Sequence, residues 1–226
     1  MRTPDQVAII IGLPAGIGAV AAYSLFIAAG MTSLPQPLVT TSAALFGPLL
    51  LIGSFGLKAA LDAHRPSPLA RLGLLLNLGA SVLVTAMLLV QIGVHDAFPA
   101  AQDRSLDMRQ VVQMVDRVQL GLDFSWDVFV AFGTAFFALA MLRHPKFGKV
   151  LGASGLLISA ALFTLNLLAY PQLPTAVGWP DAGPLVGLWY LAVSLAMLRS
   201  LRWYLATPSS AGASRGALAP TPAAGA

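Results

Sequence analysis

Six apolar stretches dominate the chain, and they constrain its fold more than any other feature. They cover 7–30, 38–58, 69–94, 119–142, 148–170 and 184–201. A helix needs about 20 mostly apolar residues to cross the hydrocarbon layer of a bilayer, and each stretch comes close to that length. The sequence therefore predicts an all-α, polytopic membrane protein with six transmembrane helices.

The composition excludes an ordinary soluble domain. Hydrophobic residues make up 57% of the chain and charged residues only 10%, whereas about 25% of residues are charged in soluble proteins. Lys and Arg outnumber the acids 13 to 9, and every acid is Asp. In a membrane protein such an excess sets orientation, so we expect no nucleic-acid binding. The absence of Cys excludes thiol catalysis and Cys-ligated metal centres.

The positions of the basic residues orient the predicted spans, because Lys and Arg in short loops stay on the cytoplasmic side. Most of them lie at the N-terminus, in the 2–3 and 4–5 connections and beyond the sixth span. These residues are Arg2, Lys58, Arg65, Arg71, Arg143, Lys146, Lys149, Arg199, Arg202 and Arg215. The other three, Arg104, Arg109 and Arg117, share the 3–4 connection with four Asp residues. We predict both termini inside (N-in, C-in) in a bacterial-type cytoplasmic membrane.

The chain divides into one membrane domain and a tail. We expect a six-helix transmembrane domain over 1–205 and a disordered cytoplasmic tail over 206–226, which is rich in Ala, Gly, Ser and Pro. The first apolar stretch is too long for a signal-peptide core and is closely followed by another span, so we interpret it as a retained helix. The sequence Ala28-Ala29-Gly30 nevertheless resembles a cleavage site.

The fourth span belongs to an unusually polar helix. Ser105 is a suitable N-cap and Asp107 falls in the first turn, so this helix is predicted to begin outside the membrane and to be extended on the outer side. At about 100° per residue, its polar side chains gather on one face. They are Arg109, Gln113, Asp116, Asp123 and Asp127, with Thr134 further along the same line.

Asp127 is the main candidate for a functional residue. At about 1.5 Å per residue it lies about 24 Å from the cytoplasmic end of the span at Arg143, and therefore one turn inside the membrane. No Lys or Arg lies in the middle or outer half of a predicted span, so Asp127 must be neutral, bind a cation, reach water or hydrogen-bond to polar groups. We predict an outer polar pocket for a cation or small polar solute. Its candidate residues are Asp123, Asp127, Asp116, Gln91, His95 and Asn166.

Two other interpretations of these residues stay open. Asp123 and Asp127 are also compatible with a structural polar network that holds helices together. If His95 converged with them, the ligands would suit zinc, manganese or iron. However, His95 and Asp96 are adjacent and point in different directions, and no HExxH or HxxxH pattern supports a metal site. We assign no metal, and the cofactor stays unknown.

The remaining histidines and the small residues of the first span have structural interpretations. His64 and His144 each lie beside Arg and near Pro, so we expect both to be solvated or to face lipid headgroups rather than to bind haem. Gly12 and Gly16 form a GxxxG pattern, which allows close helix packing within the bundle or, alternatively, in a homodimer.

Two segments of the C-terminal half carry a family resemblance. MLRHPKFGKVLGASGLLIS and PLVGLWYLAVSLAMLRSLRW combine a basic turn containing Pro, a Leu/Gly-rich helix and a closing helix with Trp. This half resembles small six-span bacterial integral membrane proteins that are grouped as a domain-of-unknown-function family. The resemblance implies the topology only, because it brings no catalytic residues.

The sequence favours a non-enzymatic function. It contains no phosphate-binding loop, nucleophile elbow or repeated transporter signature. We expect a small transporter, sensor or accessory subunit that binds a cation or small polar solute from outside. One alternative is a membrane enzyme for a lipid or quinone-like substrate, with Asp123 or Asp127 as acid–base and His95 assisting. Another is a structural subunit of a membrane complex. The expected partners are the lipid bilayer and, as alternatives, another membrane protein or a second copy.

Overall fold

Every regular element among the described residues is helical, which confirms the all-α prediction. The computed structural model describes residues 2–102 and 106–206, with their side chains except those of 97–102, 106 and 107. The elements are α1 (Pro4–Ala29), α2 (Gln36–Asp62), α3 (Pro68–Gln102), α4 (Leu106–Met141), α5 (Gly148–Ala169), η1 (Pro174–Val177), α6 (Gly183–Arg199) and α7 (Leu201–Ala206). The predicted tail lies outside the described residues except for Ala206, which ends α7.

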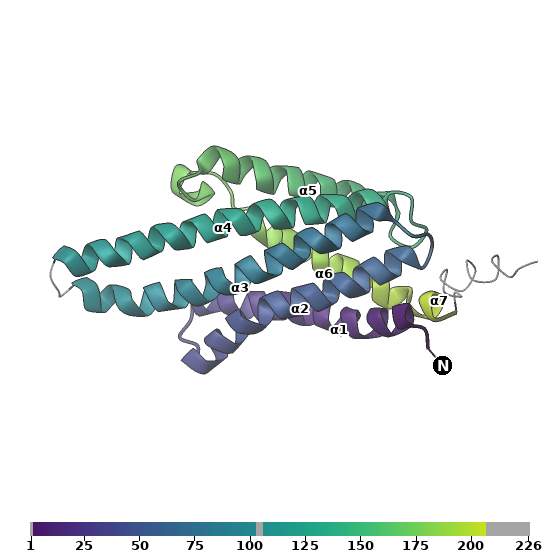
Figure 1. The fold of residues 1–226 in the computed structure, drawn as a ribbon, viewed down its shortest axis with the longest axis horizontal. Helices are drawn as coiled ribbons and strands as arrows, with labels where there is room; N and C mark the ends of the chain where they lie inside the picture. The colour runs from purple at the N-terminus through teal and green to yellow at the C-terminus, as the bar shows by residue number, and fades with distance from the viewer. Residues whose placement is uncertain (1, 103–105, 207–226) are drawn as a thin grey trace, which may run out of the picture.

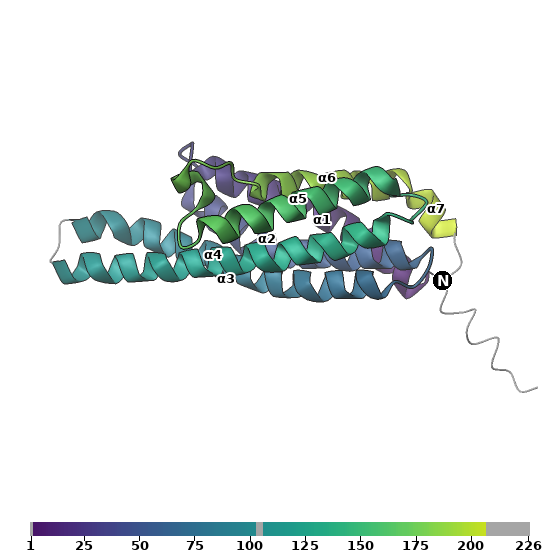
Figure 2. The same cartoon turned by 90° about the horizontal axis from the view of Figure 1, so that it is seen from above.

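The six long helices form a closed bundle (Figure 1). Each packs against the next along the chain, and α6 packs against both α5 and α1. The first and the last of these helices are therefore neighbours in space, although almost the whole chain separates them. Figure 2 shows α6 and α5 beside each other along the bundle.

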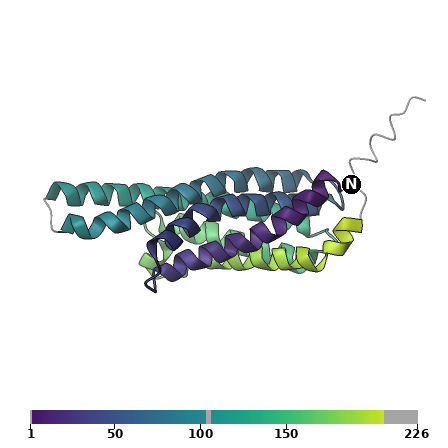
Figure 3. The ribbon, with the colours of Figure 1, turned by 90° about the horizontal axis from the view of Figure 1, so that it is seen from below.

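The two ends of the bundle differ in charge and in shape. One end, which we call the basic end, holds the N-terminus, the turns 63–67 and 142–147, and α7 (Figure 1). At the opposite end α3 and α4 project well beyond the other helices (Figure 1, Figure 2 and Figure 3). We call this the hairpin end. The fourth helix is thus extended as the sequence predicts, and the third helix is extended with it.

Among the residues that the structure describes, five helices are long and apolar enough to cross a membrane. They are α1 and α2 in full, Pro68–Asp96 of α3, Met108–Met141 of α4, and α5. The apolar helix α6 is shorter, at 17 residues. This helical apolar architecture is compatible with an integral membrane protein in a lipid bilayer, whereas six spans remain a prediction.

Glycines allow α1 and α2 to approach closely. A Cβ atom on Gly56 would lie only 2.7 Å from the Cα atom of Gly12, and one on Gly53 only 2.9 Å from that of Gly16. Side chains at this crossing would therefore force the two backbones apart, and small residues are what membrane helices use for such contacts. The GxxxG pattern of α1 therefore allows close packing against α2 within the bundle, which is one of the two packing modes predicted from the sequence.

A buried polar cluster joins three helices in the middle of the bundle. Asn77 Nδ2 of α3 donates a hydrogen bond to Tyr190 Oη of α6 over 2.8 Å, and Thr134 Oγ1 of α4 donates to the same oxygen over 3.2 Å. Asn77 and Thr134 are completely buried. Because no water reaches these groups, Tyr190 is the partner that satisfies both donors.

Replacing Tyr190 with Phe is expected to lower the free energy of unfolding by about 1–2 kcal/mol, because two buried donors lose their acceptor. Unfolding by SDS titration of protein in mixed micelles measures the change. Tyr170→Phe is the matched control, since Tyr170 is half exposed at 49%. Equal losses in both variants would show that the hydrogen bonds of Tyr190 add nothing.

Candidate functional site

A small pocket at the hairpin end contains three carboxylates. It lies between α1, α4, α5, η1 and the start of α6 and has a volume of about 90 Å³. We call it the acidic pocket. Its lining residues are Tyr23, Asp123, Trp126, Asp127, Asn166, Leu173, Pro174, Thr175, Asp181 and Gly183. No Lys or Arg is among them.

The carboxylates differ in depth. Asp181 is exposed, Asp123 is partly buried, and Asp127 is only 5% exposed. The three are close enough to repel one another when charged. Within the described residues, Asp123 and Asp127 have no hydrogen bond or ion pair. A buried charged carboxylate without a partner is strongly destabilising, so Asp127 needs a bound positive charge or a donor unless it is protonated.

The outermost carboxylate also has a local structural role. Asp181 Oδ1 accepts a hydrogen bond from the backbone N of Gly183 over 2.8 Å, at the first residue of α6. A carboxylate at this position satisfies one of the free N–H groups of a helix start and interacts favourably with the helix dipole. Asp181 therefore fixes the start of α6 at the rim of the pocket.

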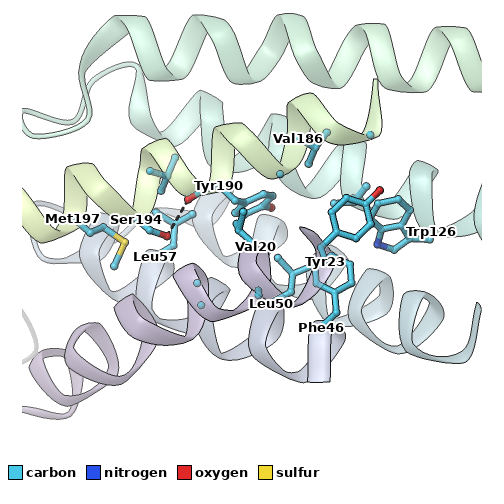
Figure 4. Close-up of a pocket in the computed structure, with 17 residues that line it drawn as sticks. Val20, Tyr23, Phe46, Leu50, Leu57, Trp126, Val186, Tyr190, Ser194 and Met197 are labelled. Atoms are coloured by element: carbon cyan, nitrogen blue, oxygen red, sulfur yellow. Dashed lines mark hydrogen bonds between the residues drawn. The ribbon is translucent and has the colours of Figure 1, made fainter. Parts of the chain in front are cut away.

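Trp126 lines the acidic pocket with a buried side chain. Its side chain is 6% exposed and its indole Nε1 is buried without a hydrogen-bond partner. Phe46 lies edge-on to it with ring centroids 6.4 Å apart, and Tyr23 stacks on Phe46 at 5.0 Å (Figure 4). A buried indole N–H normally has a partner, and this one has none within the described residues.

An apolar cavity lies inside the bundle and shares part of its lining with the acidic pocket. The two share Tyr23, Trp126 and Gly183, and the cavity runs between α1, α2, α4 and α6 as far as Met197 (Figure 4). It is narrow, with a volume of about 30 Å³. Ser194, one of its few polar residues, donates its hydroxyl to the backbone oxygen of Tyr190. No Asp, Lys or Arg is among the residues that line this cavity.

The structure brings together only part of the set of residues predicted from the sequence. Asp123, Asp127 and Asn166 line the acidic pocket. Gln91 and His95 are exposed on α3 and do not line it. Asp116 is exposed on the projecting part of α4 and lines a neighbouring groove with Gln113 and Gln172. Within the described residues, no group of three or more His, Asp or Glu could hold a metal ion.

Seven lining residues are absent from that set, among them Tyr23, Trp126 and Asp181. Asp181 carried a signal, since it is the only charged residue between the fifth and sixth apolar stretches. Trp126 also carried one, because it directly precedes Asp127, although Trp near a span end is usually a membrane anchor. Tyr23 had no signal, because its neighbours in the pocket come from distant parts of the chain.

The prediction for His144 is wrong, whereas His64 is exposed as expected. The imidazole of His144 is only 4% exposed, because α7 packs its aromatic side chains against the 142–147 turn. Its ring centroid lies 5.9 Å from that of Trp203 and 4.9 Å from that of Phe147. His144 Nδ1 accepts a hydrogen bond from the backbone N of Lys146 over 3.2 Å. Burial, and next the neighbouring His64, lower the pKa of His144 to about 4.

The buried His144 should make stability depend on pH. Its imidazole takes up a proton below pH 6.5 in the unfolded chain but only near pH 4 in the folded protein. The unfolded state therefore binds more protons in this window, and the free energy of unfolding falls as the pH drops from 6.5 towards 4. Unfolding measured across this range should show a weaker dependence in His144→Gln and an unchanged one in His95→Gln. Superimposable wild-type and His144→Gln curves would contradict the burial of a neutral imidazole.

Comparisons of the chain with models of protein families, with curated proteins and with solved structures found no match. The family resemblance of the C-terminal half therefore stays a prediction. What defines the protein is its own architecture, an all-helical apolar bundle that carries a carboxylate-lined pocket near one end.

Proposed function

We propose that the protein is a multi-pass protein of the cytoplasmic membrane that binds a cation or a small cationic solute in the acidic pocket. It acts as a small transporter, or as a sensor or accessory subunit that responds to this solute. The observation that carries the proposal is Asp127, which is 5% exposed, has no partner within the described residues and lines a pocket with two further carboxylates.

Charge and size narrow the class of solute. Three neighbouring carboxylates repel an anion and attract a cation, and Asn166, Tyr23 and Trp126 add polar groups to the walls. A volume of about 90 Å³ fits a small organic cation such as methylammonium or guanidinium. The charge becomes more deeply buried from Asp181 to Asp127, which favours entry from the hairpin end.

The proposal includes the topology expected from the basic residues. We place the basic end in the cytoplasm and the hairpin end outside, with α6 as the sixth span. At about 1.5 Å per residue, the 17 residues of α6 cover about 26 Å, close to the hydrocarbon thickness of a membrane. The acidic pocket then faces outward. On its cytoplasmic side, the bundle contains the narrow apolar cavity.

Single cysteines test this topology, because the chain has none of its own. Gln113→Cys lies on the exposed part of α4 and Lys146→Cys lies in the turn at the basic end. A membrane-impermeant maleimide should label Gln113→Cys in intact cells and Lys146→Cys only after permeabilisation. The opposite pattern would place the acidic pocket on the cytoplasmic side and contradict the proposed orientation.

Native mass spectrometry with elemental analysis tests the function itself. Gently purified wild-type protein should carry a cation or small amine that is lost from Asp127→Asn and Asp123→Asn. If intact wild-type protein carries no such species, or if both variants keep it, the two carboxylates have a structural role and do not bind a cation. A protein partner bound equally by wild type and variants would instead favour the structural-subunit alternative.

One observation supports a second candidate function, a membrane enzyme for a lipid or quinone-like substrate. The acidic pocket and the apolar cavity share three residues, so an amphipathic molecule could place its polar head at Asp127. The cavity, at about 30 Å³, would take only a small apolar group of this molecule beside Leu50 and Val186. His95 lies outside this pocket, so the acid–base role would belong to Asp123 or Asp127. A lipid or quinone that copurifies and is lost from Asp127→Asn would favour this candidate over the first.

A further inference from the structure

A second, larger pocket lies at the basic end, between the 63–67 turn and the 142–147 turn. It has a volume of about 440 Å³. One side is basic, with the guanidinium groups of Arg65 and Arg143 beside His64 and the neutral His144, and no carboxylate is among its lining residues. We call it the basic pocket. It does not include any residue of the acidic pocket, and the proposed function does not use it.

The basic pocket has an apolar side as well. Leu61, Leu69, Leu139 and Leu142 line it, and Leu139 is 38% exposed on the last turns of α4. The two arginines come from the turns, whereas Leu61, Leu69 and Leu139 come from the helix ends and Leu142 directly follows the end of α4. Such a division, charged towards the turns and apolar towards the helices, matches the chemistry of a phospholipid at the membrane surface.

The positive charge of the pocket is not neutralised by the acid nearby in the sequence. The Asp62 carboxylate forms an ion pair with Lys58 Nζ at 2.8 Å and accepts a hydrogen bond from the backbone N of Ser67 over 2.9 Å. Both oxygens of the Asp62 carboxylate therefore have partners on α2 and on the 63–67 turn. Arg65 and Arg143 are both exposed and line the pocket from different turns, so their guanidinium groups are available to an anion between them.

We propose that the basic pocket binds the phosphate group of an anionic phospholipid between Arg65 and Arg143. Guanidinium groups form two-pronged, charge-assisted hydrogen bonds with phosphate oxygens, which is why Arg is favoured at such sites. The leucine side of the pocket receives the first part of an acyl chain. The lipid thus ties the turn between α2 and α3 to the turn between α4 and α5.

The test is lipid titration of the full-length protein in detergent micelles, followed by native mass spectrometry. Phosphatidylglycerol and phosphatidylcholine are the probes, because both carry a phosphate but only the first has a net negative charge. The pocket variant is Arg65→Gln/Arg143→Gln. The matched control is Arg199→Gln/Arg202→Gln, which removes the same charge from exposed residues outside the pocket.

We expect the affinity for phosphatidylglycerol to fall by roughly fivefold for each Arg of the pocket and to change little in the control. Phosphatidylcholine should bind weakly to every variant, and Arg65→Lys/Arg143→Lys should keep much of the preference. Equal losses in the pocket variant and the control would overturn the proposal, as would unchanged binding in the pocket variant. Displacement of the lipid by an equal concentration of inorganic phosphate would also overturn it, because a free phosphate would then be the ligand.

Two features keep this test informative. Both arginines are exposed, so their replacement does not leave a hole in the core, and size-exclusion chromatography verifies that the variants stay folded. The acidic pocket is unchanged in these variants, so cation binding should persist in them. Failure of the lipid site is therefore distinguishable from failure of the proposed function.

Discussion

The Asp127→Asn variant is expected to lose saturable binding of small cations, with an affinity for guanidinium or methylammonium at least about thirtyfold below that of the wild type. Removing one partner of a buried charge pair typically costs 2–5 kcal/mol, which corresponds to about thirtyfold or more. Asn keeps the size of the side chain, so the pocket retains its shape while the deepest negative charge is removed. Trp126, which lines the same pocket, provides a fluorescence signal for the titration.

Asp116→Asn is the matched control for this experiment. It makes the same chemical change on the same helix, but Asp116 is exposed and lies outside the acidic pocket. Its affinity should stay within about twofold of the wild type, because charges separated by solvent are screened. A Trp126→Phe variant should lose the fluorescence response and thereby identify its source. If Asp116→Asn and Asp127→Asn weakened binding equally, the general surface charge rather than the pocket would attract the cation.

Gly56→Leu is expected to give the largest loss of stability. A Cβ atom at this position would lie 2.7 Å from the Gly12 Cα atom and 3.0 Å from the Ala8 backbone oxygen. Both are backbone atoms, which cannot rotate away, so α1 and α2 must separate. Overpacking of this kind costs about 1–3 kcal/mol or more, and the variant should unfold at lower SDS or fail to accumulate as folded protein.

Gly93→Leu provides the control for the helix propensity of Leu and for its added bulk. Gly93 lies inside α3, and a Cβ atom there would meet no heavy atom within 4 Å. Since Leu favours helices more than Gly does, this variant should be as stable as the wild type or slightly more stable. A similar loss in both variants would show that the close crossing of α1 and α2 is not what Gly56 provides.

The helices themselves could be predicted well from the sequence, because helix formation and length follow from local apolar patterning. The stretch 148–170 becomes α5 at Gly148–Ala169, and 184–201 becomes α6 at Gly183–Arg199. The burial of His144 could not be predicted, because it depends on α7, a short helix that folds back against a turn. The local sequence of the turn, with two basic neighbours, indicates solvent instead.

The position of the candidate residues along their helices could be predicted from the sequence, whereas the neighbour that each helix face contacts could not. A carboxylate inside an apolar stretch identifies Asp127 without further information, and Asn166 follows as a polar residue of a neighbouring span. Gln91 and His95 are predicted to lie near the end of the third span, on the same side of the membrane as Asp127. In the structure they are exposed on α3 and do not line the pocket. Distance along a helix axis can be counted from the sequence, whereas the packing partner of each helix face depends on contacts between distant segments.

The closure of the bundle by α6 has a consequence for how the protein is made. The ribosome releases α1 first and α6 after the other five long helices, yet α1 and α6 pack against each other and both line the acidic pocket. Without α6, the face of α1 that contacts α6 has no packing partner, and the pocket lacks the lining residues Asp181 and Gly183. We therefore expect the proposed solute binding to require the complete bundle, because a chain without α6 has Asp123 and Asp127 without the complete pocket.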